Sequence, residues 1–221
     1  MFCIFAKFVD VEGKKIMIYR IARAIVAIFI KLFNKWEIIG SEHVPKSGPT
    51  IFVANHISNW DPPALACSVK RTIHFMAKEE LFKIPILGTL LTLFRCYPVK
   101  RGSADRNALR ISWKYLENGQ ALGIFPEGKR SKTGEMQPFE QGAALIAIKG
   151  KATIVPVGLK GTSKAFPASL RGNICVIFGE PLYYPELFSV KLHGEDIERV
   201  NNEIVESIKK LIDGEKTGEV I

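Results

Sequence analysis

The chain has 221 residues, of which 47% are hydrophobic and 24% are charged. These fractions are typical of a globular protein and exclude a disordered or collagen-like chain. The formal net charge is +9, and the basic excess lies in residues 1–35, with seven basic and two acidic side chains, and in residues 60–132, with thirteen and six. A basic surface of this kind predicts an anionic partner, such as lipid headgroups, a phosphorylated small molecule or nucleic acid.

The cysteines and the hydropathy of the chain bear on three features: disulfide bonds, a signal peptide and transmembrane helices. The four cysteines lie far apart and include no C-x-x-C pair. We therefore expect neither a disulfide framework nor a zinc ribbon, and we expect the protein to work in a reducing compartment. Charged residues interrupt the apolar start of the chain and no small-residue cleavage site follows, which is unlike a secretory signal peptide. No stretch reaches the roughly 18 uncharged apolar residues of a membrane span. We therefore expect no cleaved leader and no transmembrane helix.

Residues 16–35 predict an amphipathic helix. At about 100° per residue, its four basic side chains fall within an arc of roughly 120°, and aliphatic and aromatic side chains occupy the opposite side. The basic side chains are Arg20, Arg23, Lys31 and Lys35. A basic stripe beside a wide apolar face favours a helix that lies in a membrane interface. The alternative is a helix that packs on the core and keeps a solvated basic edge.

After Trp36, short apolar runs alternate with amphipathic segments. Strands are predicted at residues 36–40, 50–54, 72–77, 95–99, 121–125, 153–161 and 174–182. Helices are predicted to begin at Asp61 and to span residues 79–94, broken at Pro85 and Gly88, 103–118 with Ser103 as N-cap, 141–150 and 194–213.

This alternation indicates an α/β fold, with a central, mostly parallel or mixed sheet flanked by helices. We expect residues 1–35 to form an N-terminal membrane-associating helical segment. Residues 36–213 would form one folded domain, and residues 214–221 a frayed tail.

The stretch NHISNWD, from Asn55 to Asp61, lies where the strand at residues 50–54 gives way to a helix start. Sites in open α/β sheets occur at such strand ends. If the loop folds back, Asp61 can accept a hydrogen bond from one ring nitrogen of His56 and leave the other as a general base. No G-x-S-x-G nucleophile elbow is present, so the nucleophile would be a substrate hydroxyl. The alternative is that Asp61 caps the helix and His56 is a polar loop residue.

Three further stretches carry residues suited to a site. Residues 125–131, FPEGKRS, follow a buried strand and concentrate charge, as phosphate-handling loops do. Arg101, at the end of an extended segment, can grip a phosphate with two hydrogen bonds. Pro156 within an apolar strand indicates an edge strand or a sharp turn beside a site. Taken alone, each stretch is also consistent with a solvated loop or an ordinary strand.

Together and in this order, the four stretches resemble the glycerolipid acyltransferase family, and most closely its 1-acyl-sn-glycerol-3-phosphate acyltransferase branch. The first family block, Asn-His-x-Ser-x-x-Asp, is matched by Asn55, His56, Ser58 and Asp61. The other blocks are matched by Val99, Arg101 and Gly102, by Phe125, Pro126, Glu127, Gly128, Arg130 and Ser131, and by Val155, Pro156 and Val157. The resemblance spans about residues 36–182. Lys129 departs from the family's usual Thr, and Lys100 stands where an acidic residue is common.

The resemblance implies an O-acyltransferase that moves a fatty acyl group from a thioester to the free hydroxyl of 1-acyl-sn-glycerol 3-phosphate (lysophosphatidate). The product would be phosphatidic acid for phospholipid biosynthesis. His56 would be the general base, oriented by Asp61 through the family's His-x-x-x-x-Asp spacing. The glycerol phosphate would be held by Arg101, Glu127, Gly128 and Arg130. Pro156 would lie on the strand that borders the donor channel.

The resemblance implies no metal or other cofactor, and either acyl-CoA or acyl-carrier protein as the donor. The acceptor could instead be glycerol 3-phosphate or a lysolipid with another headgroup. We expect a peripheral or monotopic protein on the cytoplasmic face of the cell membrane, with its basic helix on anionic lipid. A non-enzymatic basic module that binds anionic membranes remains an alternative. No nucleic-acid partner is expected, because no nucleic-acid-binding motif accompanies the basic charge.

Overall fold

A computed structural model describes residues 2–100, 105–131, 133–169 and 172–214, with side chains from residue 16 onward. Its centre is a seven-stranded sheet with the order β1-β7-β6-β2-β5-β3-β4. The strands are β1 (Asn34–Ile39), β2 (Thr50–Ala54), β3 (Ile73–Lys78), β4 (Tyr97–Val99), β5 (Ala121–Ile124), β6 (Thr153–Lys160) and β7 (Gly172–Phe178). All neighbouring strands are parallel except β6 and β7, which are antiparallel. The predicted mixed α/β sheet is therefore confirmed.

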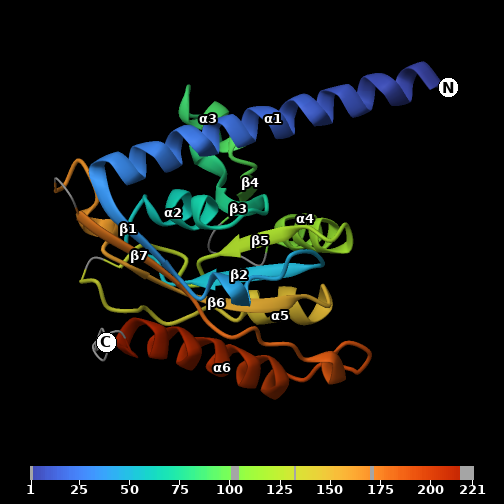
Figure 1. The fold of residues 1–221 in the computed structure, drawn as a ribbon. Helices are drawn as coiled ribbons and strands as arrows, with labels where there is room; N and C mark the ends of the chain where they lie inside the picture. Colours follow the sequence, from blue (N-terminus) through green and yellow to red (C-terminus); the bar gives the residue numbers. More distant parts are fainter. Residues whose placement is uncertain (1, 101–104, 132, 170–171, 215–221) are drawn as a thin grey trace.

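Helices cover both faces of the sheet (Figure 1). They are α1 (Phe2–Phe33), α2 (Asp61–Ser68), α3 (Leu87–Leu93), α4 (Arg106–Glu117), α5 (Gly142–Lys149) and α6 (Gly194–Asp213). Short 3-10 turns are η1 (Ser41–His43), η2 (Glu79–Lys83), η3 (Thr162–Lys164) and η4 (Pro185–Leu187). Figure 1 shows α1 along one side of the sheet, extending past it toward the N-terminus, and α6 on the opposite side.

The buried strand β2 shows how the two layers are held. Ile51 and Val53 belong to the apolar core beneath α5 and α6, whereas Phe52 and Ala54 belong to the core beneath α1 and α2. Successive side chains of a strand point to opposite faces. All four residues after Thr50 in β2 are apolar because their side chains are buried alternately in the two cores. Such a continuous apolar run is typical of a central parallel strand.

Most predicted elements are found, and the differences lie at element ends. α1 ends at Phe33 instead of residue 35, because the Asn34 side chain donates to Ile30 O (3.2 Å) and β1 starts there. α4 begins at Arg106 with Asp105 as its cap, which accepts from Asn107 N and Ala108 N; the predicted cap, Ser103, lies outside the described residues. The predicted break near Pro85 is confirmed by the separation of η2 from α3, whereas the break predicted at Gly88 is wrong, because Gly88 lies within α3.

Two predictions concern the chain ends. Gly214 follows α6 directly, and residues 215–221 of the predicted frayed tail lie outside the described part of the chain. Within the described ranges, no helix is both long and apolar enough to cross a membrane. The C-terminal half of α1 packs on the domain: Tyr19 and Ile30 are buried, and Arg23 donates to the backbone oxygens of residues 69–71 at the end of α2.

Candidate active site

The predicted site residues gather at one edge of the sheet. β2 has β5 and β6 as parallel neighbours, so the carboxyl ends of the three strands lie side by side. The loops that begin at Asn55, Phe125 and Gly161 leave from these ends. Three segments that are far apart in the sequence thereby meet.

Asn55 sets the point at which the chain leaves β2. Its buried side chain donates to Leu159 O (3.0 Å) and accepts from Leu159 N (2.8 Å). The amide thereby extends the link between β2 and β6 past their last pair, Ala54 and Val157. The position of the next residue, His56, is consequently tied to two strands.

The loop folds back and brings His56 and Asp61 together. His56 Nδ1 lies 2.7 Å from Asp61 Oδ2. The Asp61 carboxylate is fully buried, whereas 14% of the His56 side chain is exposed. Ile57 N and Ser58 N also donate to Asp61 Oδ2, each at 2.7 Å. A carboxylate on Nδ1 favours the tautomer with the proton there, which leaves Nε2 as an acceptor.

The helix-cap interpretation of Asp61 is wrong. Trp60 occupies the N-cap position of α2, and no side chain caps that helix. The Asp61 carboxylate faces back toward the loop that precedes α2, where it accepts from Ile57 N and Ser58 N.

Thr162 completes the environment of Asp61, and sequence reasoning missed it. Its buried hydroxyl donates to Asp61 Oδ1. Gly161 makes this approach possible: its φ is +73°, and a Cβ there would lie 1.6 Å from Asn173 O. The only pattern in the sequence that could have suggested Thr162 is a Gly-Thr pair after an apolar strand. That pattern points to Asp61 only when β6 is known to pair with β2, because this pairing brings the end of β6 next to the His56 loop.

Glu127 holds the backbone of His56. Its Oε1 accepts from His56 N (2.7 Å) and its Oε2 accepts from Gln137 N (3.1 Å). Burial raises the pKa of this carboxyl group, opposed by the two backbone donors. Both oxygens accept hydrogen bonds from main-chain groups, so the geometry gives Glu127 a role in positioning His56. The contact with glycerol phosphate that the resemblance implied stays a prediction.

The same loop grips His56 at two other points. Ser131 N donates to His56 O (2.7 Å), and the Phe125 ring stacks on the imidazole with centroids 4.5 Å apart. Gly128 turns the loop with a φ of +65°, where an added Cβ would lie 3.2 Å from Glu140 Oε1. The FPEGKRS stretch is therefore the frame that fixes both the main chain and the ring of His56.

A groove of about 460 Å³ lies beside the His56 loop. Ser58, Trp60 and Thr162 line it, as does Arg130, the one predicted phosphate ligand that the described residues place there. The Trp60 ring stacks on Phe29 of α1, with centroids 5.7 Å apart and planes at 9°. The groove thus combines a cationic side chain with an aromatic wall shared with the N-terminal helix.

Two predicted residues are not brought into this groove. Arg101 lies outside the described residues. Pro156 is buried in β6 and pairs with Val53, and β6 is an interior strand, so the predicted edge position is wrong. The sheet tolerates this proline because the chain just after β7 bulges opposite it: two residues separate Ile154 from Val157, but three separate their partners Leu182 and Phe178.

Comparison with known proteins agrees with this geometry. The acyltransferase family model matches residues 35–160. The chain belongs to the acyltransferase family. The crystal structure of the 1-acyl-sn-glycerophosphate (LPA) acyltransferase PlsC from Thermotoga maritima is similar to this chain. It aligns over 100% of this chain and 89% of its own, with a TM-score of 0.77 and 28% identity.

Curated relatives carry matching names. The 1-acyl-sn-glycerol-3-phosphate acyltransferase of Bacillus subtilis is 30% identical over 87% of this chain and 98% of its own length. The chloroplastic 1-acyl-sn-glycerol-3-phosphate acyltransferase BAT2 of Brassica napus is 33% identical over 74% of this chain. This chain spans about half the length of the plant relatives, with 49% of BAT2 covered.

Replacement of Thr162 tests its positioning role. Thr162→Val keeps the shape of the side chain but leaves Asp61 Oδ1 without its hydroxyl donor. We expect a loss of about 1–3 kcal/mol in the free energy of unfolding, and a kcat for acyl transfer that is roughly tenfold lower at an unchanged KM. Thr162→Ser, which keeps the hydroxyl, should restore most of the rate. Equal rates for the Val and Ser variants would contradict the role.

Replacement of Glu127 tests the frame around His56. In Glu127→Gln, one of the two backbone N–H groups faces an amide NH₂ and loses its acceptor. We therefore expect kcat to fall about tenfold or more. The control is Glu135→Gln, an exposed change in the same loop, which should have little effect.

The pH dependence of stability gives a second test of Glu127. Because folding raises the pKa of Glu127, ionisation of this group lowers the stability of the wild type as the pH rises above 4.5. Chemical denaturation should therefore show a flatter pH dependence for the variant in weak acid.

Proposed function

We propose that this acyltransferase moves a fatty acyl group from an acyl thioester to the free hydroxyl of 1-acyl-sn-glycerol 3-phosphate, making phosphatidic acid. The observation that carries the proposal is the His56–Asp61 pair beside a groove lined by Arg130. Relatives named for this reaction, in bacteria and in plants, support the choice of acceptor.

In the proposed mechanism His56 is the general base. Nε2 removes the proton of the acceptor hydroxyl while its oxygen attacks the thioester carbonyl carbon. The new C–O bond forms, the C–S bond breaks, and the imidazolium returns the proton to the departing thiolate. Asp61 stabilises the imidazolium through Nδ1. No acyl-enzyme is required, and the hydroxyl of the nearby Ser58 already accepts from Trp60 N (3.1 Å).

The phosphate of the acceptor would be bound by cationic side chains of the second and third family blocks. Arg130 lines the groove, and Arg101 is proposed as its partner from its place in the family pattern. Gly128 contributes through its turn, and Lys129 adds a further positive charge beside it. A guanidinium can hold a phosphate with two parallel hydrogen bonds. Arg101→Ala and Arg130→Ala would therefore act chiefly on KM for the acceptor.

The donor would be acyl-CoA or acyl-carrier protein, and the reaction needs no cofactor. Glycerol 3-phosphate or another lysolipid is the alternative acceptor. A lipid acceptor places the enzyme at a membrane, and we propose a peripheral or monotopic attachment through α1 on the cytoplasmic face. α1 supports this because it exposes an aliphatic stripe on the side away from the domain: Ile18, Ile21, Ile25, Ile28 and Leu32, each 47–72% exposed.

Side-by-side assay of wild type and His56→Ala tests the proposal. Thiol release and phosphatidic acid formation would be measured in detergent micelles, with lysophosphatidate and either long-chain acyl-CoA or acyl-carrier protein. We expect activity with at least one donor and a loss of at least about 10²-fold in the variant, because a general base contributes about 10²–10⁴-fold.

The control variant for this assay replaces a histidine outside the site. His193→Asn, at the N-cap of α6 far along the chain, keeps a good capping residue and should retain the rate. Undiminished transfer by His56→Ala would reject the general base. A folded wild type that binds lipid but turns over neither donor with any lysolipid would instead indicate a non-enzymatic membrane module.

A further inference from the structure

The turn between η2 and α3 presents an apolar side chain to solvent. Pro85 O accepts from Leu87 N (2.7 Å), which closes a γ-turn around Ile86. Ile86 is 78% exposed, the highest value for a large hydrophobic side chain in the described part of the chain. Ile84 and Leu90 on either side are also exposed.

The backbone at Ile86 is in a conformation that disfavours isoleucine. Its φ is +67° and its ψ is −56°. A β-branched residue is a marked outlier at positive φ, and glycine would be free of this strain. A strained turn that also holds an aliphatic side chain in water is not explained by the stability of the fold, and strain of this kind gathers at functional sites.

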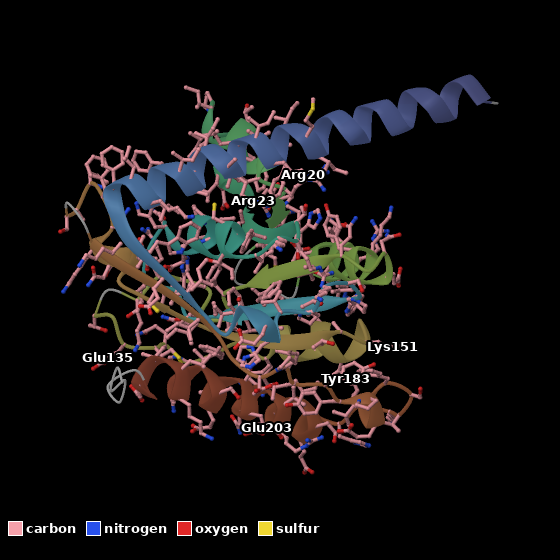
Figure 2. The ribbon with its side chains drawn as sticks, viewed as in Figure 1. Arg20, Arg23, Glu135, Lys151, Tyr183 and Glu203 are labelled. Carbon is pink, nitrogen blue, oxygen red and sulfur yellow. The ribbon has the colours of Figure 1, made fainter. Side chains whose placement is uncertain are left out.

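The helix that follows this turn, α3, packs against α1. Tyr19 of α1 contacts Phe94, just after α3, with ring centroids 6.4 Å apart. Figure 1 shows α1 and α3 on the same side of the molecule, away from α6, with the segment that leads into α3 rising beyond α1. In Figure 2, the labelled Arg20 and Arg23 lie on the side of α1 toward the domain, so the aliphatic stripe is left facing outward.

The charge of the two segments selects the partner. Residues 16–35 and 83–95 together contain six Lys or Arg residues and no Asp or Glu. Arg23 is engaged with the end of α2, and exposed lysines such as Lys31 and Lys83 flank the apolar side chains. Glu79 and Glu80, at the start of η2, form ion pairs with Lys100 and Lys78. Exposed aliphatic side chains flanked by lysines suit the interface of an anionic lipid bilayer.

We propose that the Ile84–Ile86 turn is a second membrane-insertion point, which enters an anionic bilayer together with the α1 stripe. This inference rests on the proposed membrane attachment of the enzyme. A single interfacial helix leaves the domain free to roll about the helix axis. A second contact off that axis removes the roll and fixes which side of the domain faces lipid. Because Phe29 of α1 stacks on Trp60 of the groove wall, the fixed orientation also holds the groove at the lipid surface.

Vesicle binding of Ile86 variants tests the proposal. Wild type, Ile86→Asp and Ile86→Gly would be sedimented with phosphatidylcholine vesicles that contain phosphatidylglycerol. We expect both variants to bind at least about tenfold more weakly, since each loses most of a buried aliphatic side chain. Ile86→Gly should at the same time raise the melting temperature, because glycine relieves the positive φ. The matched control is Val190→Asp, an exposed aliphatic position (55%) in a groove between α4, α5 and η4, which should bind like wild type.

A second measurement keeps the test independent of the folding of any one variant. Ile86→Trp and Val190→Trp would be bound to vesicles of lipids brominated near the headgroup. We expect additional tryptophan quenching for Ile86→Trp alone. Equal quenching of both, or unchanged binding of Ile86→Gly, would overturn the proposal. A lipid-free dimer of the wild type that Ile86→Asp dissociates would assign the surface to a second copy of the chain instead. Transfer activity in detergent micelles should survive in the Ile86 variants, so failure of the insertion point is distinguishable from failure of the proposed function.

Discussion

The buried carboxylate of Asp61 is the interaction on which the site depends. One oxygen receives His56 Nδ1 and two backbone N–H groups, and the other receives Thr162. A buried carboxylate is costly unless its oxygens are hydrogen-bonded, so this set of donors must be assembled for the fold to accept the charge. The requirement that stabilises Asp61 therefore also orients the His56 imidazole and joins the β2 loop to the end of β6.

His56 is held by residues at the ends of three parallel strands, β2, β5 and β6. The loop after β5 supplies Glu127 beneath the His56 N–H, Ser131 on its carbonyl oxygen and the Phe125 ring against its side chain. Asn55 fixes the preceding residue against β6. Two of the four motif blocks thus build and brace the position of the His56 imidazole, and the strand that carries Pro156 lies in the interior of the sheet.

One face of the N-terminal helix α1 packs on the domain, and another face is exposed. Tyr19 and Ile30 are buried and Arg23 binds the end of α2, whereas the stripe of isoleucines faces outward. The core-packing interpretation is therefore confirmed for one side of the helix, and the interfacial interpretation stays a prediction for the outward side. The stacking of Phe29 on Trp60 links this helix to the groove wall, so the proposed membrane attachment of α1 would act directly on the wall of the site.

The sequence by itself determined the α/β class and the order of the elements, because these follow from local periodicity and turn residues. β2 and α6 match their predicted ranges for the same reason. The sequence left the contact of His56 with Asp61 as one of two interpretations, because that contact depends on how the loop between them folds. Only the tertiary structure decided that Thr162 completes the Asp61 site, that the Glu127 oxygens face backbone groups, and that Pro156 is interior beside a bulge. These depend on which strands are neighbours, and the contacts of Asp61 with Thr162 and of Asn55 with Leu159 join residues 101 and 104 positions apart. Local pattern carries no record of such pairings, since they arise from the packing of the whole sheet.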